Sequence, residues 1–222
     1  MSLVKIMLVV VLVAAYVALS HVALINPDPD NIWRKIAALM LIVPILAMIN
    51  LGIIAMLRQT KANAIVLVGS GAFMLALSIY GGVLLWPKLL TRLDWFYLFQ
   101  HIATNLMLFF FFAQTLLRDR TPVITALATT LHGTLPEKIV RYTRGVTLAW
   151  ALFFAGQILL SLIIFYWFSV ETWSLFANVL NWPLVILMFL VEYICRKKMN
   201  PDFQHASIKQ SIGAYLASKN KA

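Results

Sequence analysis

The chain has few charged residues, and very few of them are acidic. Only 12% of its 222 residues are charged, and Asp and Glu together number 8. A soluble domain normally has about a quarter of its residues charged, so this composition excludes a soluble enzyme and a disordered chain. Because 62% of the residues are hydrophobic, the composition is that of an integral membrane protein.

Cysteine is almost absent too, since Cys195 is the only one. A single cysteine cannot form an intrachain disulfide or a thiolate metal cluster. The sequence also lacks a phosphate-binding loop of the ATPase type. We therefore expect no metal and no cofactor, and any energy source has to be a partner or an ion gradient.

Long apolar runs fill most of the sequence. A helix that crosses the hydrocarbon core needs about 20 apolar residues. The segments that meet this criterion are 3–25, 36–57, 64–86, 95–117, 145–169 and 173–195. The first is too long for the hydrophobic part of a signal peptide and is interpreted as an uncleaved span. The sequence thus predicts an all-α membrane domain of six helices over residues 1–198, followed by a basic amphipathic tail at 199–222.

Basic residues are distributed unevenly between the two sides of the predicted membrane. If the N-terminus is cytoplasmic, 14 of the 18 Lys and Arg lie on the cytoplasmic side and 4 on the other. Tryptophans fall at the outer ends of the spans, as in an aromatic belt. Both observations indicate that the two termini are cytoplasmic. Topology and anionic lipids then explain the net charge of +10, and nucleic acid is not expected as a partner.

The only sizeable loop joins the fourth and fifth spans, at 118–144. Thr121 can cap a short helix with Pro122 at its first position, and Gly133 can end it. We expect this helix to lie on the membrane surface. The Thr-Leu-Pro-Glu pattern that ends at Glu137 is typical of a capping box. It predicts that the fifth helix begins well before the bilayer.

Charged and polar residues gather near the cytoplasmic ends of the last two predicted spans. Glu192 lies about one turn inside the boundary, where a carboxylate is costly unless it is paired. One interpretation is a structural ion pair among basic anchors. The other is a site for an anionic ligand, because the planar guanidinium group of arginine binds carboxylate or phosphate through two N–H groups. The candidate ligand-binding residues are His132, Arg141, Tyr142, Arg144, Glu192 and Arg196.

A second polar group lies inside the predicted spans. Spacings of three and four residues place three of its members on one helix face. These side chains must face the bundle interior, either in interhelical hydrogen bonds or in a polar cavity. The candidate group is His101, Thr104, Asn105 and Asn178, and other intramembrane polar residues are Asn50, Thr147, Gln157, Ser161 and Asn181. His21 and His101 lie at similar predicted depths, so haem ligation by this pair is an alternative to the expectation of no cofactor.

Several short stretches in the second half of the chain carry a resemblance. They are 100–105 (QHIATN), 131–133 (LHG), 141–144 (RYTR), 147–150 (TLAW) with 153–154 (FF), 173–178 (WSLFAN), 192–193 (EY) and Arg196. Through them the chain resembles a family of uncharacterised bacterial inner-membrane proteins. The resemblance covers roughly residues 94–201, and the first three spans match only in hydropathy.

This resemblance implies a biosynthetic context. Members tend to be encoded among fatty-acid-like biosynthesis genes, such as those for aryl polyene pigments, and some carry the label ketosynthase. That activity needs a nucleophilic cysteine in a soluble α/β core, whereas Cys195 lies at a helix end among lysines. The implied role is an accessory component of an acyl-chain or lipid-like product pathway in the bacterial inner membrane.

Membrane lipids, an acidic acyl carrier protein or biosynthetic enzymes are the implied partners, because acidic carrier proteins suit a basic cytoplasmic face. Two alternatives remain open. One is a small transporter or flippase-like protein that uses the intramembrane polar residues. The other is a membrane acyltransferase-type enzyme that uses His132 or Glu192.

The uneven distribution of basic residues predicts the topology directly. A reporter fused after Ala222 should score as cytoplasmic, and a reporter inserted at Pro29 should score on the opposite side. Paired fusions that are active on only one side of the membrane make this measurement. The reverse pattern would reject the assignment.

Overall fold

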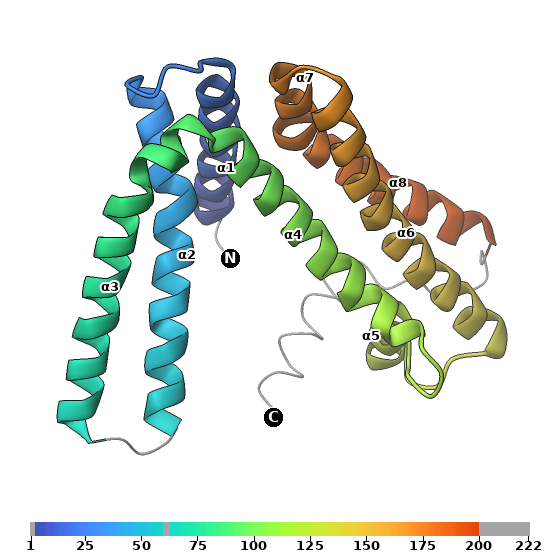
Figure 1. Cartoon of the computed structure of the whole chain (residues 1–222). Coiled ribbons are helices and arrows are strands. Elements are labelled where there is room, and N and C mark those ends of the chain that lie inside the picture. Colours follow the sequence, from blue (N-terminus) through green and yellow to red (C-terminus); the bar gives the residue numbers. More distant parts are fainter. Residues whose placement is uncertain (1–2, 60–62, 200–222) are drawn as a thin grey trace. The chain divides into compact units, whose positions relative to one another are not determined.

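The computed structural model describes residues 3–59 and 63–199 (Figure 1). Within these residues the chain is helical and contains no strand. The helices are α1 (Leu3–Ile25), α2 (Ile32–Gln59), α3 (Ala64–Thr91), α4 (Leu93–Ala113), α5 (Val123–His132), α6 (Glu137–Trp167), α7 (Val170–Ser174) and α8 (Asn181–Met199). A 3₁₀ turn, Gln114–Leu116, follows α4. Apart from Met199, the predicted tail at 199–222 lies outside the described residues.

Five helical stretches are long and apolar enough to cross a membrane. They are Ile32–Leu57, Val68–Thr91, Leu93–Leu116, Glu137–Trp167 and Val170–Met199. They indicate a multi-pass membrane protein. α1 has the bounds predicted for a first span, and its part Val11–Ile25 is an apolar helix. α6 begins at Glu137, ahead of the predicted span at 145–169, but Glu137 is its first residue and not the third, so the predicted capping box is wrong.

The predicted spans 64–86 and 95–117 imply a loop at 87–94, but these residues are largely helical. α3 continues through Pro87, and α4 starts at Leu93. Leu89 and Leu90 are buried, and so is Leu93. Burial of such side chains stabilises a structure by about 1.5–3 kcal/mol each, which offsets the hydrogen bond that a proline removes from a helix.

The last predicted span contains a change of helix type. α7 begins at Val170, so residues 170–172, which lie between the predicted spans 145–169 and 173–195, are also helical. The hydroxyl of Ser169 accepts the Thr172 N–H at 3.2 Å and caps this helix. A π-helical segment, Leu175–Leu180, then precedes α8.

α5 occurs where the loop helix was predicted, but its N-terminus differs. It begins at Val123, so Thr121 is not its cap. Its first two N–H groups instead donate to the hydroxyls of Thr115 and Thr147, at 3.2 and 3.3 Å. Side chains of neighbouring segments thus accept hydrogen bonds from the first backbone N–H groups of α5, which have no partner within their own helix. Gly133 ends the helix with a φ of 74°, as predicted.

The chain divides into two compact units, each described here by itself. Unit 1 comprises Met1–Phe99 and Phe168–Leu180, and unit 2 comprises Gln100–Trp167 and Asn181–Ala222. Unit 1 therefore contains α1, α2, α3, the start of α4, and α7 with the π-helical segment. Unit 2 contains the rest of α4 together with α5, α6 and α8.

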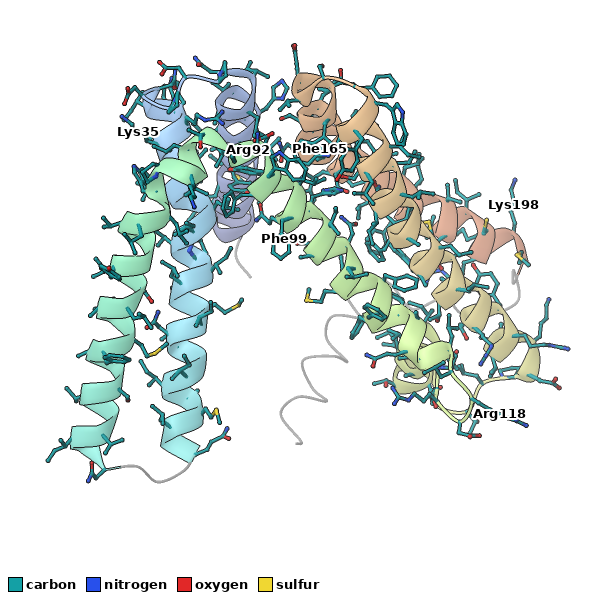
Figure 2. The ribbon with its side chains drawn as sticks, in the orientation of Figure 1. Lys35, Arg92, Phe99, Arg118, Phe165 and Lys198 are labelled. Carbon is teal, nitrogen blue, oxygen red and sulfur yellow. The ribbon has the colours of Figure 1, made fainter. Side chains whose placement is uncertain are left out.

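One arginine joins three segments of unit 1. Arg34 is only 4% exposed, and its guanidinium donates to the backbone oxygens of Ala23, Asn26 and Leu90. Two of these oxygens belong to the last turns of α1 and α3, where carbonyls lack partners within their own helix. The helix dipole favours a cation at the same place. The side chains of Lys35 and Arg92 lie at this end of unit 1 (Figure 2).

Hydroxyl and amide groups add further ties within unit 1. The Ser20 hydroxyl donates to the Tyr97 hydroxyl at 3.1 Å, and the Tyr97 hydroxyl donates to the Ala37 carbonyl at 3.4 Å. These bonds connect α1, α4 and α2. On the α2–α3 pair, the Asn50 amide donates to the Ser78 hydroxyl at 3.0 Å. Interhelical hydrogen bonding was one of the two predicted roles for Asn50.

Replacing Arg34 with lysine should destabilise the protein although the charge is retained. The ammonium group of a lysine cannot donate to three carbonyls that the wider, planar guanidinium group of Arg34 reaches at the same time. Loss of a hydrogen bond from a charged group costs about 1.5–3 kcal/mol, so we expect a clearly lower melting temperature in detergent. Lys35→Met is the control, because the Lys35–Asp30 ion pair at 3.0 Å is solvent-exposed at Asp30 and contributes little. Equal melting temperatures for the two variants would contradict the assigned role of Arg34.

Candidate functional site

A groove of about 520 Å³ lies in unit 2 between α6 and α8. These two helices run side by side in opposite directions (Figure 1). The groove occupies the start of α6 and the end of α8. Its lining residues are Lys138, Arg141, Tyr142, Gly145, Val146 and Ala149 on α6, and Met188, Val191, Glu192, Cys195 and Met199 on α8.

The groove exists because α6 presents small residues toward α8. Gly145 and Ala149 are four residues apart and so share one face of the helix. A Cβ added at Gly145 would meet nothing within 4 Å. The sequence reasoning did not identify these two residues, and their spacing is the signal that could have revealed them.

A cluster of aromatic rings holds α4, α6 and α8 together next to the groove. The Trp150 ring lies 5.9 Å from Phe112, 5.7 Å from Phe154 and 4.6 Å from Phe189. Such ring pairs contribute about 0.5–1.5 kcal/mol beyond the area they bury. We call these four residues the aromatic layer. Its rings pack beside the groove without lining it.

Glu192 is neutralised where it lies. Its carboxylate is 3.5 Å from the Arg196 Nε, and the side chains are 16% and 32% exposed, respectively. The Arg196 Nε is buried without a well-aligned hydrogen bond, so the contact is an ion pair. The Tyr142 hydroxyl also donates to the Glu192 backbone oxygen, at 3.4 Å. The two helices are therefore tied at the charged end of the groove.

The structure brings only some of the predicted ligand-binding residues together. Arg141, Tyr142 and Glu192 line the groove, and Arg196 adjoins it through Glu192. Arg144 does not line it, because its guanidinium donates to the Leu116 carbonyl at 2.8 Å.

His132 and Lys138 also differ from the prediction. His132 is the last residue of α5 and does not line the groove either. Lys138 does line the groove, but it was not among the candidates.

The intramembrane polar candidates belong to different units. Asn105 is buried in unit 2 and donates to the His101 carbonyl at 2.8 Å, whereas Thr104 is exposed. Asn178 belongs to unit 1 and donates to the Ser174 hydroxyl at 3.0 Å. The same hydroxyl lies 3.0 Å from His21 Nδ1. One nitrogen of the His21 ring is thus engaged with α7.

The chain matches no protein-family model, no curated protein and no solved structure. Among the residues described, no group of three or more His, Cys, Asp or Glu is placed to hold a metal ion. The groove is therefore interpreted from its own chemistry. The groove has mostly apolar walls, and the basic side chains of Lys138 and Arg141 lie at its rim.

Replacing Glu192 with glutamine should destabilise unit 2. The change leaves the partly buried Arg196 guanidinium without its counterion. Breaking a buried pair costs about 3–5 kcal/mol, and the partial exposure of this one reduces our expectation to about 1–3 kcal/mol. Thermal unfolding in detergent measures the effect. The control is Glu137→Gln, because the Glu137–Arg141 pair at 3.8 Å is exposed on both sides. A larger loss for the control would contradict the assignment.

Proposed function

We propose that the chain is a six-span membrane protein with both termini in the cytoplasm. In this proposal it holds an anionic acyl-chain or lipid-like molecule in the α6–α8 groove, as an accessory component of a biosynthetic pathway in the bacterial inner membrane. The single observation that supports the ligand assignment most strongly is the groove itself, with its apolar walls and basic rim. Each part of the proposal has its own support.

The proposed topology places the groove at the cytoplasmic boundary. Basic residues at the start of α6 and the end of α8 lie at one end of unit 2, and Figure 2 shows Lys198 at the end of α8. The positive-inside tendency favours the cytoplasm for this end. The Thr125 and Thr143 hydroxyls lie 2.7 Å apart and hold α5 against the first turns of α6. We therefore propose that α5 lies along the cytoplasmic surface of the membrane.

The walls and the rim of the groove have different tasks. A lipid tail gains little by leaving other tails for an equally apolar wall, so the walls admit an acyl chain without selecting it. Selection is the task of Lys138 and Arg141 at the rim. Because Arg196 already neutralises Glu192, the rim has an excess of positive charge. Such a rim favours an anionic headgroup.

The resemblance over residues 94–201 supports a pathway context for this ligand. If acyl chains are delivered by a carrier protein, the acidic surface of such a carrier complements the basic cytoplasmic face. Membrane lipids are the other proposed source of the bound chain. In either case the acyl chain of the ligand enters the groove between Gly145 and Val191, and its anionic group stays near Lys138.

Filling the groove should abolish ligand binding. Ala149→Trp places a large ring between α6 and α8, and Leu148→Trp places the same ring at a neighbouring position that is 48% exposed. Native mass spectrometry of the purified protein should show a bound acyl species in the parent and in Leu148→Trp. Its occupancy should fall about ten-fold or more in Ala149→Trp, equal to about 1.4 kcal/mol. Equal occupancy in both variants would reject the groove as the site.

Native mass spectrometry also tests whether the basic residues at the rim of the groove select an anionic headgroup. Arg141→Ala should reduce binding of an anionic amphiphile more than binding of a neutral one with the same chain. Arg144→Ala is the matched control, because this arginine is engaged with the Leu116 carbonyl and should affect stability alone. Pathway output at matched membrane abundance should follow the same order. If Arg144→Ala reduces binding as strongly as Arg141→Ala does, the charge acts from a distance and the rim assignment is wrong.

A further inference from the structure

Beyond the aromatic layer, the buried face of α6 becomes polar. Along this helix toward Trp167, the residues that follow Trp150 and Phe154 on the same face are Gln157 and Ser161. Gln157 is 3% exposed and Ser161 is fully buried. This end of unit 2 is remote from the groove, so the feature does not depend on the proposed function.

The register of the helices brings three amide side chains to one level. Trp150 contacts Phe112 on α4 and Phe189 on α8, and both helices run opposite to α6. Each amide is offset from one of these rings by a similar number of residues. Gln157 follows Trp150 by seven residues and Asn105 precedes Phe112 by seven. Asn181 precedes Phe189 by eight. At about 1.5 Å per residue, the three amides lie about 10–12 Å along their helices from the level of Trp150, Phe112 and Phe189.

Two of these amides have oxygens without a donor. Gln157 Oε1 and Asn181 Oδ1 are buried and accept no hydrogen bond from any residue that the structure describes. A buried polar atom of this kind costs about 1–3 kcal/mol, and native structures pair more than 90% of such groups. The Asn105 amide nitrogen is engaged within its own helix, because it donates to the His101 carbonyl at 2.8 Å and lies 3.3 Å from His101 Nε2. A donor from outside the described residues would therefore satisfy these two oxygens.

The chemistry of this donor follows from the surroundings. A cation would need a counterion, and the side chains placed at this level, Asn105, Gln157 and Asn181, are neutral amides. A neutral O–H group donates to an amide oxygen without that penalty. We propose that Gln157 and Asn181 form a hydrated site within the membrane-crossing helices. In this site they bind the hydroxyl groups of small neutral solutes, and water occupies it otherwise.

Thiol labelling tests this proposal with the full chain. In a Cys195→Ser background, Ser161→Cys places a thiol beside Gln157, and Ala151→Cys places one at the level of the aromatic layer. Both parent positions are buried, at 0% and 2% exposure. A thiol ionises and reacts only where water reaches it. The water-soluble reagent 2-aminoethyl methanethiosulfonate should therefore label Ser161→Cys about ten-fold faster or more than Ala151→Cys.

Glycerol is the probe for the hydroxyl ligand. It should slow labelling of Ser161→Cys, and sucrose at equal osmolality should not. Adding Gln157→Leu should remove this protection. Gln157→Leu alone should lower the melting temperature, because it removes an acceptor that a bound hydroxyl or water satisfies. Equal labelling of the two thiols, labelling that glycerol does not slow, or a higher melting temperature for Gln157→Leu would each overturn the proposal. None of these results bears on the groove.

Discussion

The absence of water around membrane-crossing helices is the constraint on which this structure depends. Backbone and side-chain polar groups there must find partners within the protein. The described segments are accordingly helical, and their ends are satisfied by distant side chains. Arg34 supplies three donors to carbonyls of unit 1, and the Thr115 and Thr147 hydroxyls accept the first amides of α5. A polar atom that lacks such a partner stands out against this background.

Unit 2 is organised around the aromatic layer. On one side the helices separate into a groove with a basic rim, and on the other side the buried face turns to amides. The two ends of α6 therefore present separate chemical environments.

Sequence periodicity and composition predicted the helices well and their ends poorly. The bounds of α1 agree with the prediction and α6 begins ahead of its predicted span, because apolar runs are local signals. The connection between α3 and α4 was predicted as a loop, because Pro87 and nearby charges suggest one. Only the fold reveals that the intervening leucines are buried. At the groove, charge positions identified Arg141 and Glu192, but no sequence signal separates Arg141 from Arg144, which bonds a carbonyl of a distant turn.

The structure also changes the meaning of the charge count. Arg34 was counted among the four basic residues outside the cytoplasmic set, yet its guanidinium is buried and fully occupied by carbonyls. Of the others, Lys35 is paired with Asp30, and the Arg92 guanidinium lies 5.7 Å from the centre of the Trp95 ring. These charges have local partners, whereas Lys138 at the groove has no acidic partner among the described residues. The number of basic residues therefore differs from the number of unpaired positive charges, and Lys138 at the groove is a charge that no acidic side chain among the described residues neutralises.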